Sequence, residues 1–327
     1  MNHVLPILPT TSVGSLPKPA SIRNLRSKVA RHEADPADLA EAVRVATREV
    51  IAMQEALGID ILVHGEMERG DMVAYFAEEW DGFELSGFVR AYGNRYYQKP
   101  VAKRRLSAQG PVTVDMWSFA QSLTEHPVKG MLTGPYTLMD WSFNEAYPSR
   151  RDFALALADL VHDEAVALEK AGCRFIQVDE PALSTRPEEI ELAIEAMGRV
   201  TRGLTVKTVS HMCYGDWQSV YPRFLDLPVD QLDLEAANND FVILDLLARG
   251  PIRPEIALGV VDVHSHRVET AEEVEQALLR ALEVIPKERL YVDPDCGLKT
   301  RTGAEARDKL QAIVEGTRRV RTRLGSP

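Results

Sequence analysis

The stretch "RFIQVDE", residues 174–180, joins a short apolar run to two adjacent carboxylates. A run of this length without alternating polar residues is typical of a strand that is buried on both faces of a parallel sheet. Seven further stretches have a similar form: "TTSVG" (10–14), "ILVHGE" (61–66), "GMLTGP" (130–135), "TVKTVSHMC" (205–213), "QLDLEAA" (231–237), "IALGVVDVH" (256–264) and "RLYVDPDC" (289–296). The sequence therefore predicts eight parallel strands.

Amphipathic stretches separate these runs and predict helices. Asp35 and Pro36 are typical of a helix N-cap followed by proline at the first helical position, and Gly58 is typical of a helix end. Further helices are expected at three places: about residues 150–170, after the capping-box pair Thr270 and Glu273, and near residues 303–321. Strand–helix alternation repeated eight times is typical of a (β/α)₈ TIM barrel, in which the C-terminal ends of all strands meet at one mouth.

Residues from about 80 to 112 do not fit this alternation, because they are rich in aromatic residues and contain glycines. We expect an insertion after the second strand, in the form of a hairpin near the barrel mouth. The sequence contains no repeat, low-complexity tract or convincing domain linker. The prediction is an α/β chain in which residues 1–327 form a single barrel domain.

The acidic composition of the chain limits its partners. There are 49 acidic residues against 38 basic ones, and the formal net charge is -11. Binding to nucleic acid or to an anionic membrane needs broad positive charge, so neither is expected as the main partner. The N-terminus has no signal-peptide pattern, and no apolar run approaches the roughly 20 residues of a membrane span. With only three cysteines, which argue against a disulfide framework, a cytoplasmic protein is expected.

Side chains with metal-binding donors follow several of the predicted strands. His211 and Cys213 lie at the end of the fifth predicted strand, Glu235 at the end of the sixth, and Cys296 at the end of the eighth. Residues two apart on an extended segment point to the same face, so His211 and Cys213 can act together. An imidazole, a carboxylate and two thiolates suit tetrahedral zinc in number and in kind. A lone cysteine near a strand end is more often a packing residue, and Cys173 is interpreted in that way.

The two thiolates in this set favour one kind of chemistry. Hydrolytic zinc sites usually keep three protein ligands and an open position at which water is acidified. A site with two thiolates is a poorer Lewis acid, but it can hold an incoming thiol as its thiolate at neutral pH. A free thiol with a pKa of about 8.5 is mostly protonated under those conditions. Alkyl transfer to sulfur is therefore favoured over hydrolysis.

Seven motifs occur in order along nearly the whole chain: "LPTTSVGSLP", "GIDILVHGEMERGDMVAYF", "VKGMLTGP", "IQVDEPAL", "HMCY", "GVVDVHSH" and "VDPDCGLKTR". Together they resemble the catalytic, C-terminal half of cobalamin-independent methionine synthase. The resemblance implies a barrel that transfers a methyl group from a methylated folate to zinc-bound homocysteine, giving methionine. It also implies a zinc site at the four donors already selected: His211, Cys213, Glu235 and Cys296.

The resemblance implies further roles, residue by residue. It assigns homocysteine binding to Val13, Gly14, Ser15, Glu66 and Asp179, proton donation to His264, and contacts with the pterin of the methyl donor to Arg95, Tyr96 and Trp141. Two carboxylates can hold the amino group of an amino acid, and donors at Ser15 can hold its carboxylate. Histidine titrates near neutral pH, so His264 can protonate the leaving nitrogen of a methylated folate. The competing interpretations are a hydrogen-bonded structural histidine and, for Trp141, a core tryptophan.

The chain also departs from this family. Compared with the full-length synthase, we expect it to lack the second, N-terminal barrel, and it carries His266 where the family usually has proline. The methyl donor therefore stays open between 5-methyltetrahydrofolate and a methylcorrinoid protein, and an accessory protein is a candidate partner in place of the missing barrel.

Four other functions are weighed against this one. A zinc enzyme that alkylates a different thiol, such as coenzyme M, would not need the two carboxylates Glu66 and Asp179. A lyase related to uroporphyrinogen decarboxylase would need no zinc, so metal analysis separates it. A zinc hydrolase is disfavoured by the two thiolates, and a non-enzymatic binding protein by the intact set of ligand types.

Overall fold

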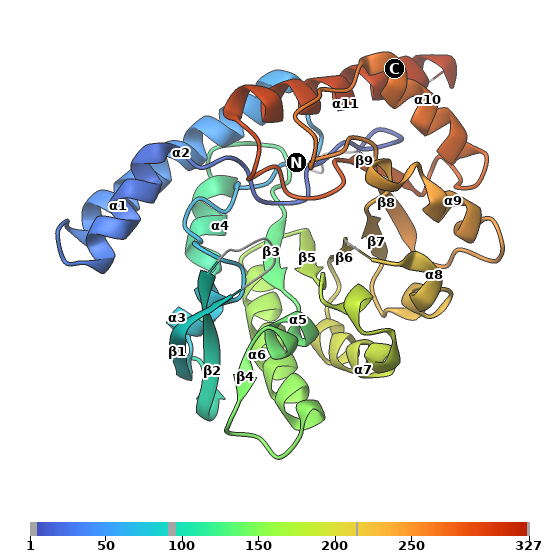
Figure 1. The fold of residues 1–327 in the computed structure, drawn as a ribbon. Helices are drawn as coiled ribbons and strands as arrows, with labels where there is room; N and C mark the ends of the chain where they lie inside the picture. The colour runs from blue at the N-terminus through green and yellow to red at the C-terminus, as the bar shows by residue number, and fades with distance from the viewer. Residues whose placement is uncertain (1–4, 91–95, 214, 326–327) are drawn as a thin grey trace. The chain divides into compact units, whose positions relative to one another are not determined.

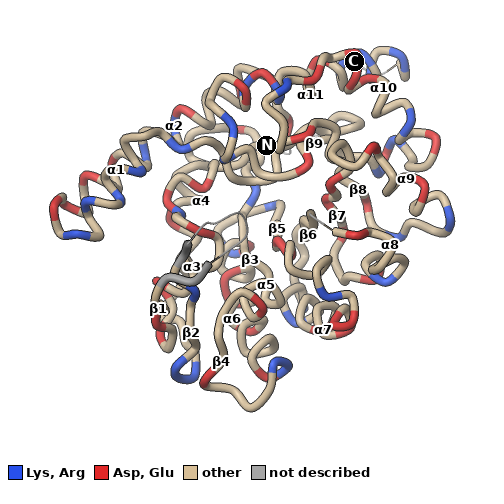
Figure 2. The backbone as a smooth tube through the Cα atoms, viewed as in Figure 1, with Lys and Arg blue, Asp and Glu red and all other residues tan. Residues whose placement is uncertain are grey.

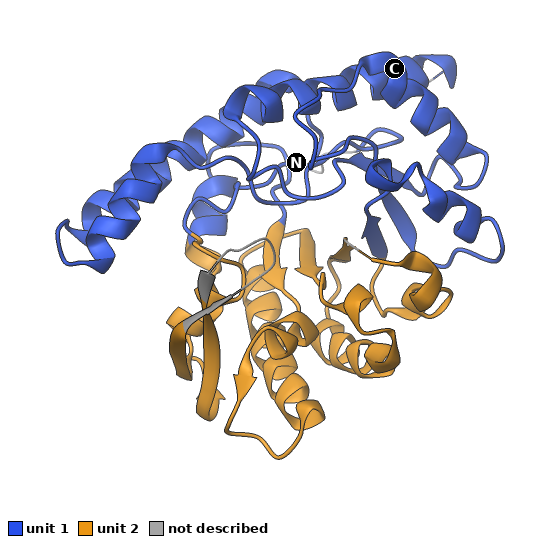
Figure 3. Cartoon of the chain, viewed as in Figure 1, with its two compact units in different colours: residues 1–68, 116–129, 231–327 blue, residues 69–115, 130–230 orange. Residues whose placement is uncertain are grey.

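Helices and parallel strands alternate along the chain in a computed structural model that describes residues 5–90, 96–213 and 215–325 (Figure 1). The chain divides into two compact units (Figure 3). Unit 1 contains residues 1–68, 116–129 and 231–327, and unit 2 contains residues 69–115 and 130–230. The prediction that residues 1–327 form one domain stays a prediction.

Unit 1 is built on three parallel strands, β7 (Gln231–Leu234), β8 (Glu255–Gly259) and β9 (Leu290–Asp293), which pair in that order. Its helices are α1 (Ala20–Ala30), α2 (Pro36–Leu57), most of α4 (Val114–Gln121), α9 (Val242–Leu247), α10 (Ala271–Leu282) and α11 (Gly303–Arg323), with a 3₁₀ turn η5 (Ala237–Asn239). Helices α10 and α11 pack against each other (Figure 1).

The first two predicted strands, 10–14 and 61–66, are present in unit 1 only as isolated parallel bridges. Thr10 bridges to Val292 of β9, and the two segments are joined by side chains as well as by backbone. The Gln54 side chain donates to the carbonyl of Val63 at 2.8 Å and accepts from its N–H at 3.1 Å. Because a side chain from α2 takes both backbone groups of Val63, a regular ladder is interrupted at that position.

Unit 2 contains a second set of parallel strands, β3 (Gly130–Thr133), β5 (Phe175–Asp179) and β6 (Lys207–Met212), which also pair in that order. Its helices are α3 (Ala74–Glu79), α5 (Pro135–Asp140), α6 (Arg150–Lys170), α7 (Ile190–Thr201) and α8 (Trp217–Val220), with 3₁₀ turns η2 (Leu183–Thr185), η3 (Pro187–Glu189) and η4 (Arg223–Asp226). Helix α6 packs against both α5 and α7 (Figure 1).

A separate antiparallel pair lies in unit 2, within the stretch that did not fit the alternation. Strands β1 (Asp81–Arg90) and β2 (Tyr96–Ser107) pair antiparallel, and the short strand β4 (Phe143–Asn144) adds to β2 in parallel. Its placement near a barrel mouth stays a prediction.

The helix ends follow local chemistry, as predicted. Asp35 accepts a hydrogen bond from the N–H of Ala37 at 2.8 Å, and Gly58 ends α2 with a left-handed φ of 83°. Helix α10 begins with the complete capping box of Thr270 and Glu273. These boundaries confirm the expected helices, because a cap depends only on residues a few positions apart.

All residues of β3, β5, β7 and β9 are buried, as expected for parallel strands covered on both faces. The α/β class and the parallel pairing are therefore confirmed, whereas closure of eight strands into a barrel stays a prediction. Helices such as α2 and α6 carry acidic and basic residues together rather than charges of one sign (Figure 2). In the described part of the chain, none of the helices could span a membrane.

Candidate metal and substrate site

Two predicted metal ligands lie at the C-terminal end of β6 in unit 2. His211 is in the strand and Cys213 follows it, and each residue is only 2% exposed. The backbone is fixed here, because Glu180 donates its N–H to the carbonyl of His211 at 2.9 Å and the Ser184 hydroxyl donates to the carbonyl of Cys213 at 3.0 Å. Ligand atoms of His211 and Cys213 lie within 4.8 Å of each other. An imidazole and a thiol are thus held together at a buried strand end.

The other two predicted ligands lie in unit 1, after β7 and β9. Glu235 is buried, and Cys296 is half-buried. The side-chain amide of Asn238 donates to Oε1 of Glu235 at 2.7 Å. Asp295, which precedes Cys296, accepts backbone hydrogen bonds from residues 236–238. The segments that carry Glu235 and Cys296 are therefore tied to each other within this unit.

His211, Cys213 and Cys296 make up a candidate metal-binding group of one imidazole and two thiols. Glu235, the fourth predicted ligand, is not a member of that group. The third cysteine, Cys173, is buried two residues before β5 begins, and its thiol donates to the carbonyl of Phe175 at 3.1 Å. Burial raises the pKa of Cys173 to about 12, so this thiol stays protonated and fits a packing role.

The predicted homocysteine segment lies in unit 1 beside the Cys296 segment. Its three residues are buried: Val13, Gly14 and Ser15. Ser15 forms a parallel bridge with Gly65, the residue before Glu66, and accepts the N–H of Leu298 at its carbonyl at 2.8 Å. A Cβ at Gly297 would lie 2.1 Å from Oγ of Ser15, so only glycine allows this close approach. Ser15 is therefore placed directly against the residue that follows Cys296.

The two predicted ammonium-binding carboxylates lie in different units. Glu66, in unit 1, has a left-handed φ of 54°, which is uncommon for a residue other than glycine. Asp179 ends β5 in unit 2, is 8% exposed, and accepts a hydrogen bond from the side chain of Gln177 at 2.8 Å. Strained backbone at a predicted binding residue is a feature that functional sites often have.

Glu180, next to Asp179, has a structural task that the sequence did not reveal. It is fully buried and accepts hydrogen bonds from the N–H groups of Tyr136 and Thr137, at 3.0 and 2.8 Å, and from the Thr137 hydroxyl at 2.7 Å. Burial raises the pKa of Glu180 to about 7, although these three donors act in the opposite direction. Glu180 thus ties the end of β5 to the start of α5.

The predicted proton donor, His264, lies after β8 in unit 1 and is half-buried. The backbone N–H of His264 donates to Oδ1 of Asp262 at 2.7 Å, and the backbone N–H of Asp262 donates to Oε1 of Glu269 at 3.0 Å. Glu269 in turn forms an ion pair at 2.7 Å with the ammonium of Lys309, a lysine of α11 that is completely buried. A chain of polar contacts therefore holds the backbone of the His264 loop.

The predicted methyl-donor contacts lie in three different places in the chain. Arg95 lies outside the described residues, and Tyr96 is described only as the first residue of β2. Trp141 follows α5, donates its backbone N–H to the carbonyl of Thr137 at 2.9 Å, and is half-buried. Whether these residues contact a donor stays a prediction.

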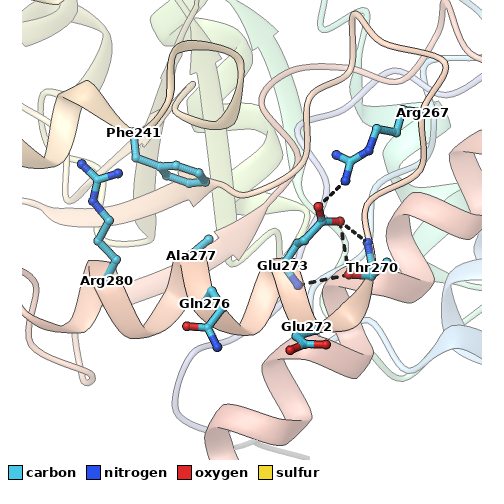
Figure 4. Close-up of a pocket in the computed structure, with 8 residues that line it drawn as sticks. All are labelled: Phe241, Arg267, Thr270, Glu272, Glu273, Gln276, Ala277 and Arg280. Atoms are coloured by element: carbon cyan, nitrogen blue, oxygen red, sulfur yellow. Dashed lines mark hydrogen bonds and ion pairs between the residues drawn. The ribbon is translucent and has the colours of Figure 1, made fainter.

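A surface pocket lies along α10 of unit 1 (Figure 4). Its lining residues are Phe241, Arg267, Thr270, Glu272, Glu273, Gln276, Ala277 and Arg280. No residue selected from the sequence as a ligand, substrate contact or proton donor is among them, and the capping box of α10 occupies part of its wall. The pocket is therefore separate from the candidate site.

Comparison with known proteins places the chain in a family. Residues 8–319 match the family described as "Cobalamin-independent synthase, Catalytic domain". The chain is 39% identical over 324 residues to the methionine synthase of Saccharolobus solfataricus, a match that covers 98% of this chain and 97% of that protein. It is 43% identical to the 5-methyltetrahydropteroyltriglutamate–homocysteine methyltransferase of Streptomyces griseus subsp. griseus, covering 98% of this chain but only 43% of that protein.

A solved structure agrees with these matches. The B12-independent methionine synthase from Shewanella sp. W3-18-1, in complex with selenomethionine, has a TM-score of 0.86 and is 29% identical. The match covers 97% of this chain and 99% of that chain. The similarity in fold and the similarity in sequence therefore both cover almost the whole chain.

Proposed function

Because the chain belongs to the family of cobalamin-independent methionine synthase catalytic domains and is a methyltransferase of that type, we propose that it methylates the thiol of L-homocysteine on a zinc ion, giving L-methionine. The observation that carries the metal part of this proposal is the group formed by His211, Cys213 and Cys296. We also propose that the eight predicted strands close into a (β/α)₈ barrel, since Val128, bridged to Leu62, leads directly into β3.

The chemistry of the donors fits zinc. One imidazole, two thiols and a carboxylate, from His211, Cys213, Cys296 and Glu235, match the number and softness of ligands that zinc prefers. Three of the four are almost completely buried, where an uncompensated charge is costly. Bound there, zinc would keep the homocysteine thiol deprotonated at neutral pH and nucleophilic.

The amino-acid part of the substrate needs its own contacts. We assign its ammonium group to Glu66 and Asp179, and its carboxylate to the segment of Ser15, because charge-assisted hydrogen bonds are strong enough to orient it. The close approach of Ser15 to Gly297 supports this assignment, since it places the segment beside a proposed metal ligand. An acceptor thiol without an amino group would have no ammonium group for Glu66 and Asp179 to bind.

The role of His264 as a proton donor depends on which methyl donor is used. If the donor is a methylated folate, His264 protonates the leaving nitrogen, which is otherwise a poor leaving group. If the donor is a methylcorrinoid protein, no such proton is needed. The relative from Streptomyces griseus is named for a triglutamate folate, but this chain spans 43% of it, so both donors and an accessory protein stay in the proposal.

Methionine formation by the purified protein tests the proposal. The protein would be assayed with homocysteine and, in separate reactions, with monoglutamyl methylfolate, polyglutamyl methylfolate and methylcobalamin, while elemental analysis measures bound zinc. We expect about one zinc per chain and turnover with at least one donor. Coenzyme M replaces homocysteine in a parallel reaction, and methylation of coenzyme M instead of homocysteine would favour the other alkyltransferase.

A pair of cysteine variants makes the assay specific. Cys296→Ser should lose both zinc and methyl transfer, whereas Cys173→Ala, which removes a buried thiol outside the proposed ligand set, should keep both. Full activity in metal-free protein would overturn the proposed mechanism.

A further inference from the structure

Asp295 joins two segments that each carry a proposed zinc ligand. Its Oδ1 accepts the N–H groups of Ala236 and Ala237 at 2.9 and 2.8 Å, and its Oδ2 accepts the N–H of Asn238 at 2.7 Å. These three residues follow Glu235 directly, and Asp295 itself precedes Cys296. One carboxylate is therefore bonded to three consecutive amides of the loop after β7.

Asp295 is closely surrounded by the neighbouring strand β8 and the segment that follows it. The residue is completely buried, and its N–H donates to the carbonyl of Val261 at 3.1 Å. A Cβ at Gly259, the last residue of β8, would lie 2.3 Å from Oδ1 of Asp295. Strand β8 therefore has glycine at the position closest to the Asp295 carboxylate, because a larger residue would not allow this close approach.

Asn238 extends this arrangement to the ligand itself. Its backbone is fixed by Asp295, and its side-chain amide donates to Oε1 of Glu235 at 2.7 Å. A ligating carboxylate is usually oriented by an outer hydrogen bond, and losing such a bond commonly costs 10- to 100-fold in metal affinity or activity. The amide of Asn238 is placed to supply that bond.

We propose that Asp295 and Asn238 are positioning residues that set the orientation of Glu235 and its register with Cys296, and thereby the metal affinity of the site. This inference rests on the proposed zinc function. Neither residue takes part in methyl transfer: Asp295 acts through the backbone of the loop and Asn238 through the Glu235 carboxylate.

The principal test is Asn238→Ala. Asn238 is exposed, so the variant should fold and should unfold at the temperature of the parent protein in the metal-free state. Zinc affinity, measured by competition with a chromogenic chelator, should fall about 10- to 100-fold. The visible absorption bands of protein loaded with Co²⁺ instead of zinc should shift, because they report the geometry of the ligands rather than turnover.

Asp295→Asn is the stronger second variant, and Asp60→Asn is its control. In the Asp295 variant an NH₂ group meets backbone N–H groups, so the loop should move and zinc affinity should fall further. Asp60 accepts the N–H and the hydroxyl of Thr10, both at 2.8 Å, in the same unit. Its variant should lower stability and leave the zinc affinity and the Co²⁺ spectrum unchanged.

The outcomes separate this inference from the proposed function. If the parent protein binds neither zinc nor Co²⁺ tightly, the proposed function fails. If the parent binds both and Asn238→Ala has the same zinc affinity and the same Co²⁺ spectrum, the positioning role is overturned while the proposed function stands. If the Asp60 variant shifts the spectrum as much as the Asn238 variant does, the effect is general destabilisation and the positioning role is overturned as well.

Discussion

The three cysteines show how neighbouring groups, rather than burial alone, give residues of one type different roles. Cys173 and Cys213 are both buried, but Cys213 lies within 4.8 Å of a histidine nitrogen at a strand end, whereas Cys173 donates to a backbone carbonyl. The sequence could indicate this difference, because "HMC" places two donors two residues apart and Cys173 has no such neighbour. It could not indicate how strongly Cys173 is withdrawn from thiol chemistry.

We expect Cys173 to resist alkylation at a pH where ordinary thiols react. Burial raises its pKa to about 12, so the reactive thiolate is almost absent at every pH well below that value. Native protein treated with iodoacetamide at pH 8 and digested for mass spectrometry should carry no label at Cys173, while protein unfolded in urea should carry it. Labelling of Cys173 in the native protein before any other cysteine would contradict the packing role.

Lys309 offers a second test at this scale. Its ammonium group is completely buried and pairs with Glu269, so Lys309→Met leaves a carboxylate without its partner charge. Removing one member of a buried pair typically costs about 3–5 kcal/mol, and replacing both members is far less damaging. Urea unfolding should show Lys309→Met as strongly destabilised and Lys309→Met with Glu269→Gln as partly restored.

The control for Lys309 is an exposed pair. Arg31 and Glu33 are ion-paired at 2.8 Å with side chains that are 58% and 52% exposed, so Arg31→Met should cost far less stability than Lys309→Met. Equal losses at the two sites would argue that Lys309 is not part of a buried ion pair.

At the scale of elements, the helices could be predicted better than the strands. The boundaries of α2 and α10 follow from caps whose chemistry is contained within a few residues. The segments at 10–14 and 61–66 read as strands because their composition is apolar, yet Gln54 takes the backbone groups of Val63. The Gln54 side chain belongs to a helix, and it replaces strand partners of the Val63 backbone. The residues around Val63 contain no pattern that would predict this contact.

The roles of Asp295 and Glu180 escaped prediction for the same reason. Asp295 binds amides 57 to 59 residues away in the sequence, and Glu180 binds amides that are 43 and 44 residues away. The neighbouring Cys296 and Asp179 were selected because their chemistry was recognisable. Asp295 and Glu180 were not selected for a structural role, because a structural carboxylate and a catalytic one cannot be distinguished in the sequence until the hydrogen-bond donors around them are known.

The start of α11 provides a pH-dependent prediction. Glu305 accepts the N–H of Thr302 and a hydrogen bond from His266, and these contacts lower its pKa to about 2. Since the pKa is depressed in the folded state, the stabilisation is present above the ordinary value of 4.5 and is lost as pH falls towards 2. Between pH 6 and pH 3 the melting temperature should therefore fall more for the parent protein than for Glu305→Gln.

Glu315→Gln serves as the control for that measurement. Glu315 is exposed in the middle of the same helix, so its variant removes one negative charge without touching the cap. If both variants change the pH dependence of the melting temperature equally, the effect comes from net charge and the cap has no special part in it.

At the scale of the whole molecule, the proposed zinc site links metal binding to the stability of the folded chain. A metal that binds only the folded chain stabilises it in proportion to the logarithm of free metal over Kd, by about 4 kcal/mol at a thousandfold excess. Removing zinc with a chelator should therefore lower the melting temperature, and adding zinc back should restore it. Cys296→Ser should show neither change, whereas Cys173→Ala should show both. A melting temperature of the parent protein that ignores the chelator, although zinc is lost, would mean that the ion contributes nothing to holding the folded chain.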